Sequence, residues 1–112
     1  MMVCITAQAP GLDAPVEPRF VHAPFFVFIE TGTGEVHSVA NELCGGGAGG
    51  AGPRVVQFIA EYGAEVLVTG RLGGHAEQAL GAAGIPAYSF TEERTVDEAL
   101  RAFRLCALRE LA

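Results

Sequence analysis

The chain has 112 residues, half of them hydrophobic, and a formal net charge of −6. This length allows one domain with a buried core, and the composition is typical of a globular protein. The negative charge argues against nucleic acid as a general partner, and no apolar run approaches the roughly 20 residues that a membrane helix needs. We therefore expect a single domain over residues 1–112, monomeric, that binds neither nucleic acid nor membranes.

The three cysteines, Cys4, Cys44 and Cys106, have no spacing typical of a disulfide framework or a zinc site. The chain starts without the basic and long apolar segments of a secretory signal peptide. Free thiols without an export signal indicate a reducing compartment, so the sequence predicts a cytoplasmic protein. All seven basic residues are arginine, whose planar guanidinium suits delocalised anions.

The first half of the chain predicts three strands. Residues 2–7 are apolar and rich in β-branched side chains, which is typical of a buried strand. The proline-rich segment 8–19 predicts a long loop. Residues 24–30 and 35–41 flank the tight turn TGTG, so they predict a hairpin.

The second half of the chain predicts alternating helices and strands. Pro53 suits the first position of a helix, and the continuous apolar run at 65–70 predicts a strand covered on both faces. A helix over 73–84 and a strand over 85–90 follow. The remaining segment, 95–111, predicts one long helix, because it opens with a capping-box pattern and repeats apolar residues on one helical face.

The predicted order of elements is β-β-β-α-β-α-β-α. A hairpin followed by right-handed βα crossovers gives a protein of the α/β class, a three-layer α/β/α sandwich with a ribonuclease-H-like motif. We expect a five-stranded mixed sheet in the order 3-2-1-4-5, with strand 2 antiparallel.

A binding site is expected at the carboxyl ends of strands 1, 3 and 4, because open α/β sheets bind ligands where the strand order reverses. The loops 8–23, 42–52 and 70–74 are predicted to converge there. Two of them lead into helix N-termini, which present N–H groups to anions. The cofactor-binding candidates are Arg19, Phe20, His22, Asn41, Cys44, Gly45, Gly46, Gly47, Gly49, Gly50, Arg54, Gly70, Arg71, Gly74 and His75.

The loop from Gly45 to Gly52 contains six glycines in eight residues. Glycine lets the backbone approach a bulky ligand closely and lets successive N–H groups point toward it. The alternative is an ordinary mobile surface loop. The loop is not a nucleotide P-loop, since the chain has no lysine, and the first strand lacks the carboxylates of a two-metal nuclease. We interpret the loop as part of the binding site.

Several candidate residues have two interpretations. Cys44 is the best-placed thiol to ligate a soft metal such as copper or iron, or it is a small apolar residue. His75 either contacts an anion or is solvated. Phe20 either packs in the core or forms an apolar wall beside a cluster. Cys4 and Cys106 are expected in the core.

Residues 49–88, together with the segment PRF-x-x-A-x-F at 18–26, resemble the nitrogenase iron–molybdenum cofactor biosynthesis accessory family. The most specific parts are GGAG before a helix, the V-x-V-T-G strand and AGI before a strand. The opening ITAQAPGLDAPVEPRF is especially similar to a small member that holds a molybdenum–copper sulfide cluster without covalent attachment. The resemblance covers nearly the whole chain and implies binding or carrying of anionic metal–sulfur clusters rather than catalysis.

The resemblance also bears on how a cluster is held. Larger members have a histidine before an F-G pair, whereas Arg19 occupies that position here and Val21 replaces the glycine. This difference favours capture by charge and hydrogen bonds at Arg19, with His22 and Cys44 as candidate metal ligands. We expect a non-enzymatic carrier of a molybdenum–copper sulfide cluster, or a related iron–molybdenum–sulfur cluster, with other proteins as delivery partners. The alternative is a metal-free interaction or regulatory module on the same fold.

Overall fold

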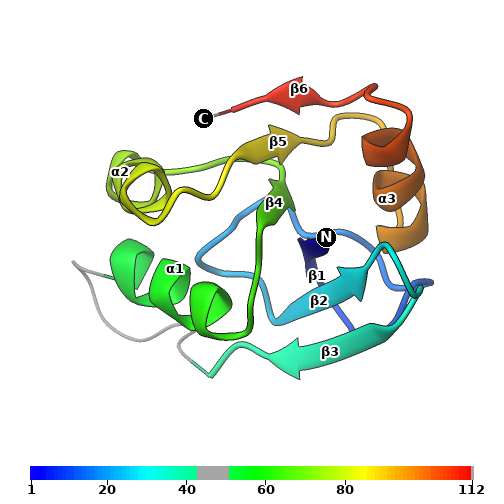
Figure 1. Cartoon of the computed structure of the whole chain (residues 1–112), viewed down its shortest axis with the longest axis horizontal. Coiled ribbons are helices and arrows are strands. Elements are labelled where there is room, and N and C mark those ends of the chain that lie inside the picture. Colours follow the sequence, from blue (N-terminus) through cyan, green and yellow to red (C-terminus); the bar gives the residue numbers. More distant parts are fainter. Residues whose placement is uncertain (43–50, 112) are drawn as a thin grey trace.

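The structure is a computed structural model, and it describes residues 1–42 and 51–111. These residues form three helices and one mixed sheet of six strands (Figure 1). The strands are β1 (Met2–Ala7), β2 (Phe25–Glu30), β3 (Val36–Ala40), β4 (Val66–Thr69), β5 (Ala87–Ser89) and β6 (Arg109–Glu110). The helices are α1 (Ala51–Glu61), α2 (Gly74–Ala83) and α3 (Val96–Arg104).

The strand order is β3-β2-β1-β4-β5-β6. β2 runs antiparallel to β1 and β3, while β4 runs parallel to β1 and β5. The predicted order 3-2-1-4-5 and the antiparallel strand 2 are therefore confirmed, and so is the mixed α/β class. The ribonuclease-H-like motif stays a prediction.

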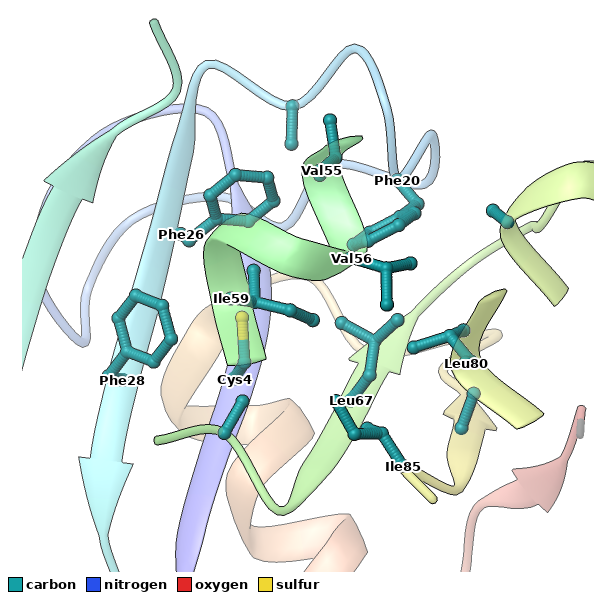
Figure 2. Close-up of a cluster of buried hydrophobic side chains, with 14 residues drawn as sticks. Cys4, Phe20, Phe26, Phe28, Val55, Val56, Ile59, Leu67, Leu80 and Ile85 are labelled. Carbon is teal, nitrogen blue, oxygen red and sulfur yellow. The ribbon is translucent and has the colours of Figure 1, made fainter. Parts of the chain in front are cut away.

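Side chains of the central strands alternate between two hydrophobic clusters. Cys4 belongs to a cluster with α1 and α2, whereas Val3 and Ile5 belong to a cluster with α3. Successive residues of a strand point to opposite faces, so a strand that is apolar throughout needs cover on both. The first cluster is drawn in Figure 2, where the α1 side chains Val55 and Ile59 lie over the sheet.

The predicted helix over 95–111 is wrong in its second half. α3 ends at Arg104, and Cys106 has a left-handed backbone with a φ of 56°. The Cys106 N–H donates to the Phe103 carbonyl at 3.0 Å, and the Ala107 N–H donates to the Ala102 carbonyl at 2.9 Å. These two bonds form a Schellman motif, which ends the helix and turns the chain back.

The reversed chain forms β6, which pairs antiparallel with β5 through Ser89 and Arg109. The sheet thus has six strands rather than the five predicted. Leu108 packs in the α3 cluster and Leu111 in the α1–α2 cluster, so the two side chains lie on opposite faces, as residues three apart in a strand do. Phe103, Ala107 and Leu111 are spaced four residues apart, which also fits one face of a helix, and this periodicity predicted a helix here.

A smaller difference concerns the start of α1. α1 begins at Ala51, before Pro53, so Pro53 is not its first residue.

Across residues 1–42 and 51–111, none of the helices has the length and apolar character needed to cross a membrane.

Candidate functional site

The loop after β1 crosses the carboxyl ends of β1 and β4. The Glu17 N–H donates to the Thr6 carbonyl at 2.9 Å, and the Thr6 hydroxyl donates to the Glu17 carbonyl at 2.6 Å. The next carbonyl, of Pro18, accepts from the N–H groups of Gly70 at 3.1 Å and Arg71 at 2.7 Å. Residues 17 and 18 are therefore bonded to the ends of two neighbouring strands.

Gly70 makes this crossing sterically feasible. A Cβ atom at position 70 would lie 2.6 Å from both Cα and Cβ of Pro18, closer than real Cβ atoms come to such neighbours. The absence of a side chain lets the loop after β4 lie directly against the loop after β1. Directly beyond this contact, Arg19 and Arg71 form an isolated parallel β-bridge. The structure thus brings together two of the predicted arginines.

Three buried hydroxyl groups support the crossing from below. Thr6, Thr69 and Ser89 end β1, β4 and β5, or nearly so, and all three are buried. The hydroxyl oxygens of Thr6 and Thr69 lie 2.9 Å apart, and the Ser89 hydroxyl is 3.0 Å from the Gly70 carbonyl. This row of hydroxyl groups was not predicted from the sequence. A hydroxyl residue near the end of each apolar strand is the signal that could have indicated it.

A pocket of about 320 Å³ opens beside the bridge, lined by Arg19, Phe20, Val21, His22, Arg71, Leu72 and Gly73. Phe20 is 2% exposed and belongs to the core cluster, with its ring centroid 6.0 Å from that of Phe26 (Figure 2). Phe20 therefore both packs in the core and forms one wall of the pocket. Guanidinium donors beside apolar walls suit a large, weakly hydrated anion.

The Arg19 side chain contacts a carboxylate that was not among the predicted site residues. Oε2 of Glu17 accepts from the Arg19 backbone N–H at 3.1 Å and from Arg19 Nε at 3.2 Å. The Glu17 side chain is 8% exposed, whereas that of Arg19 is 56% exposed. The positive charge of Arg19 at the pocket is therefore partly offset by a buried negative charge.

The starts of α1 and α2 lie against each other next to this region. A Cβ atom on Gly52 would lie 3.0 Å from the Ala76 nitrogen, so these first turns touch. Gly74 and His75 open α2 and are exposed, and Arg54 is exposed in α1. These three predicted site residues are not among the described residues that line the Arg19–Arg71 pocket.

Asn41 is buried behind the pocket rather than in its wall. Its Nδ2 donates to the carbonyls of Val21 at 3.1 Å and Ala23 at 2.8 Å, and its backbone N–H donates to Pro24. These bonds tie the loop that carries His22 to the end of β3. The structure thus gives Asn41 a bracing contact with the site loop.

A second pocket, of about 550 Å³, lies on the other side of the Pro18–Gly70 crossing. Gln8, Arg71, Phe90 and Arg94 are among its lining residues, so the loop after β5 takes part. Only the loops after strands 1, 3 and 4 were predicted to form the site. Because β5 is parallel to β4, its carboxyl end lies at the same edge, and the strand order alone could have indicated this.

Cys44, Gly45, Gly46, Gly47, Gly49 and Gly50 lie outside the described residues, so their predicted roles stay predictions. Cys4 is fully buried, as expected, and burial raises the pKa of its thiol. Cys106 is exposed, which contradicts the prediction that it is a core residue, because the helix that would bury it has already ended. Within residues 1–42 and 51–111, no group of three or more His, Cys, Asp or Glu residues is arranged to hold a metal ion.

Comparison with known proteins gives the family. Residues 1–105 match the family described as dinitrogenase iron-molybdenum cofactor. The chain belongs to this family. The resemblance predicted from the sequence is thereby confirmed.

Solved structures agree with this assignment. The apo form of the orange protein from Desulfovibrio gigas is 38% identical, with a TM-score of 0.93, over 99% of this chain and 92% of that one. A protein from Thermotoga, proposed to be a NifB protein and placed in the DUF35 family, is 35% identical, with a TM-score of 0.85, over 98% and 92%. PH0822, at 24% identity and a TM-score of 0.78 over 99% and 96%, shares the fold. No relative was found among the curated proteins.

Proposed function

We propose that this chain is a non-catalytic carrier of an anionic molybdenum-containing metal–sulfur cluster, held without covalent attachment in the Arg19–Arg71 pocket. The cargo is a molybdenum–copper sulfide cluster or a related iron–molybdenum–sulfur cluster. The observation that carries the proposal is the β-bridge between Arg19 and Arg71, which joins two guanidinium-bearing residues at one pocket in a protein of net charge −6.

The chemistry of the pocket supports an anionic sulfide cargo. Arginine is weakly hydrated and presents planar N–H donors, while Phe20, Val21 and Leu72 offer apolar contact. A cluster of this class brings its own bridging sulfides, so the protein has to supply charge, shape and hydrogen bonds rather than a full ligand set. The pocket volume of about 320 Å³ is at the small end of the range for ligand sites.

The family relationship supports the same class of cargo. The family is described by the iron–molybdenum cofactor, and the orange protein, at 38% identity, was solved in an apo form. A carrier function accounts for both descriptions, because a carrier exists with and without its cargo.

The test is a titration of tetrathiomolybdate plus copper(I) into the protein, followed by visible absorption. The variant Arg19→Gln/Arg71→Gln is compared with Arg104→Gln/Arg109→Gln, which changes two exposed arginines at α3 and β6 by the same charge. A charge-assisted hydrogen bond contributes about 1.5–3 kcal/mol, so each pocket arginine should account for roughly a tenfold to hundredfold change in affinity. High salt should weaken the wild type more than the pocket variant.

Three outcomes are informative. Equal affinity of both double variants would remove the cargo from this pocket. A wild-type protein that stays colourless in the titration and when purified from its native host would favour the metal-free interaction module. Cys44→Ser should weaken binding moderately, and complete loss of colour in that variant would establish direct Cys44 ligation instead.

A further inference from the structure

Glu17 is a buried carboxylate at the edge of the site, and the carrier function just proposed does not use it. The residue as a whole is 6% exposed and does not line the Arg19–Arg71 pocket. One of its oxygens, Oε2, accepts both from the backbone N–H of Arg19 and from the Nε of the same residue. Glu17 therefore reaches the pocket through Arg19.

The position of Glu17 is fixed by the sheet. Its backbone N–H and carbonyl are both bonded to Thr6, which is fully buried in the central strand β1. The following residue, Pro18, is bonded to Gly70 and Arg71 at the end of β4. The carboxylate thus projects from a rigid part of the loop, and its contact with Nε restrains a side chain that is otherwise 56% exposed.

We propose that Glu17 is a positioning residue that orients Arg19 and at the same time limits the affinity of the pocket for anions, so that a bound cargo can be released. This inference rests on the proposed anion-carrier function. The contact uses only one of the five N–H groups of the guanidinium, so the four on the terminal nitrogens are not consumed by it. The negative charge of Glu17 repels any anion that those groups hold.

The size of the repulsion follows from the geometry. An anion bonded to the terminal nitrogens of Arg19 would lie roughly 8 Å from the Glu17 carboxylate, given ordinary bond and hydrogen-bond lengths. Even with the full dielectric screening of water, a unit charge at that distance changes the affinity for a dianion by about five- to tenfold. This repulsion is useful to a carrier, because the repulsion shortens the residence time of the cargo without removing the donors that select the cargo.

Glu17→Gln separates orientation from charge, since the amide oxygen can still accept from Arg19 while the negative charge is lost. The probe is tetrathiomolybdate alone, titrated by calorimetry at low and high salt, with its release followed by stopped-flow absorption. Glu61→Gln is the matched control: it makes the same charge change at an exposed residue where α1 ends, at the opposite edge of the sheet. We expect Glu17→Gln to bind about five- to tenfold more tightly and release more slowly, and Glu61→Gln to change affinity less than about twofold.

Equal or weaker binding by Glu17→Gln, with the wild type binding normally, would overturn the inference and leave the carrier function intact. Absence of binding in the wild type, both to tetrathiomolybdate alone and to tetrathiomolybdate plus copper(I), would instead overturn the carrier function. The orienting role has its own readout, the Arg19 Nε–H signal in a proton–nitrogen correlation spectrum, assigned by its loss in Arg19→Gln. We expect slow solvent exchange of this proton in the wild type and in Glu17→Gln, and fast exchange in Glu17→Ala. Equal exchange in all three would refute the orienting role whether or not the cargo binds.

Discussion

Replacing Gly70 by alanine should disrupt the Arg19–Arg71 pocket, because alanine adds a Cβ atom at a close contact between two loops. The new Cβ would lie 2.6 Å from Cα and Cβ of Pro18 and 2.9 Å from the Pro18 carbonyl oxygen. These are backbone and ring atoms, which cannot move aside by a rotamer change. The two loops must therefore separate, and with them the bridge between Arg19 and Arg71.

The expected magnitude has two parts. Overpacking at a tight contact costs about 1–3 kcal/mol of the free energy of unfolding. The hydrogen bonds from Gly70 and Arg71 to Pro18, at 3.1 and 2.7 Å, lengthen when the loops separate, and each contributes about 0.5–1.5 kcal/mol. We expect a total loss of about 2–4 kcal/mol, together with a loss of at least about tenfold in anion affinity, because Arg19 and Arg71 no longer face one ligand.

Urea unfolding measures the loss of stability, and titration with tetrathiomolybdate in the absence of urea measures the loss of anion affinity. Gly81→Ala is the matched control, because a Cβ at this exposed position in α2 meets nothing within 4 Å. In a helix interior, alanine is more favourable than glycine by about 0.8–1.0 kcal/mol. The same substitution should thus stabilise the protein at position 81 and destabilise it at position 70.

An unchanged unfolding midpoint in Gly70→Ala would show that the close contact between the two loops does not exist in solution. A destabilised variant with wild-type affinity would show that the Arg19–Arg71 bridge is irrelevant to anion binding. Either result would refute part of the reasoning.

Three further changes test other parts of the fold. Cys106→Gly should stabilise the protein by about 1 kcal/mol, because the left-handed backbone at this position is unfavourable for a residue with a Cβ. Cys106→Val should destabilise the protein. A higher unfolding midpoint for Cys106→Val than for Cys106→Gly would contradict the Schellman motif. Thr95→Ala should cost about 1 kcal/mol in the same assay, because the Thr95 hydroxyl accepts from the Glu98 N–H at 3.2 Å, whereas Thr95→Ser should be nearly neutral. In the native protein at pH 8, iodoacetamide should label Cys106 and leave Cys4 unlabelled until the chain unfolds. The reason is that burial raises the pKa of the Cys4 thiol and removes its reactive thiolate. Peptide mapping that finds Cys4 labelled before Cys106 would contradict the burial of Cys4.

Much of the architecture was predictable because it depends on local patterns. The apolar run of β1 indicated a buried strand, that of β4 indicated a strand covered on both faces, and the turn between β2 and β3 indicated a hairpin. Right-handed crossovers then leave few arrangements, so the strand order 3-2-1-4-5 followed from the order of elements. The family motifs are distributed along the chain, so the family could likewise be recognised from the sequence alone.

The sequence pattern failed where one spacing fits two structures. Apolar residues at 103, 107 and 111 suit one helical face, yet the chain turns at Cys106 and Leu111 packs as a strand residue. A left-handed cap is usually indicated by glycine or asparagine, and cysteine gives no such signal. The outcome depends on whether the sheet edge at β5 gains more from a pairing strand than the helix gains from another turn, which is a tertiary property.

The site itself was decided by contacts between distant parts of the chain. The sequence placed Arg19 and Arg71 at one edge of the sheet, because each follows the carboxyl end of a parallel strand. Their pairing, however, requires Pro18 to lie against Gly70 and its carbonyl to accept a hydrogen bond from the Thr69 hydroxyl. Thr69 is 51 residues away from Pro18 in the sequence. The burial of Glu17 beneath Arg19 follows from the same crossing. No local periodicity encodes such a contact, because its energy comes from close packing and hydrogen bonds that form only after the strands have assembled.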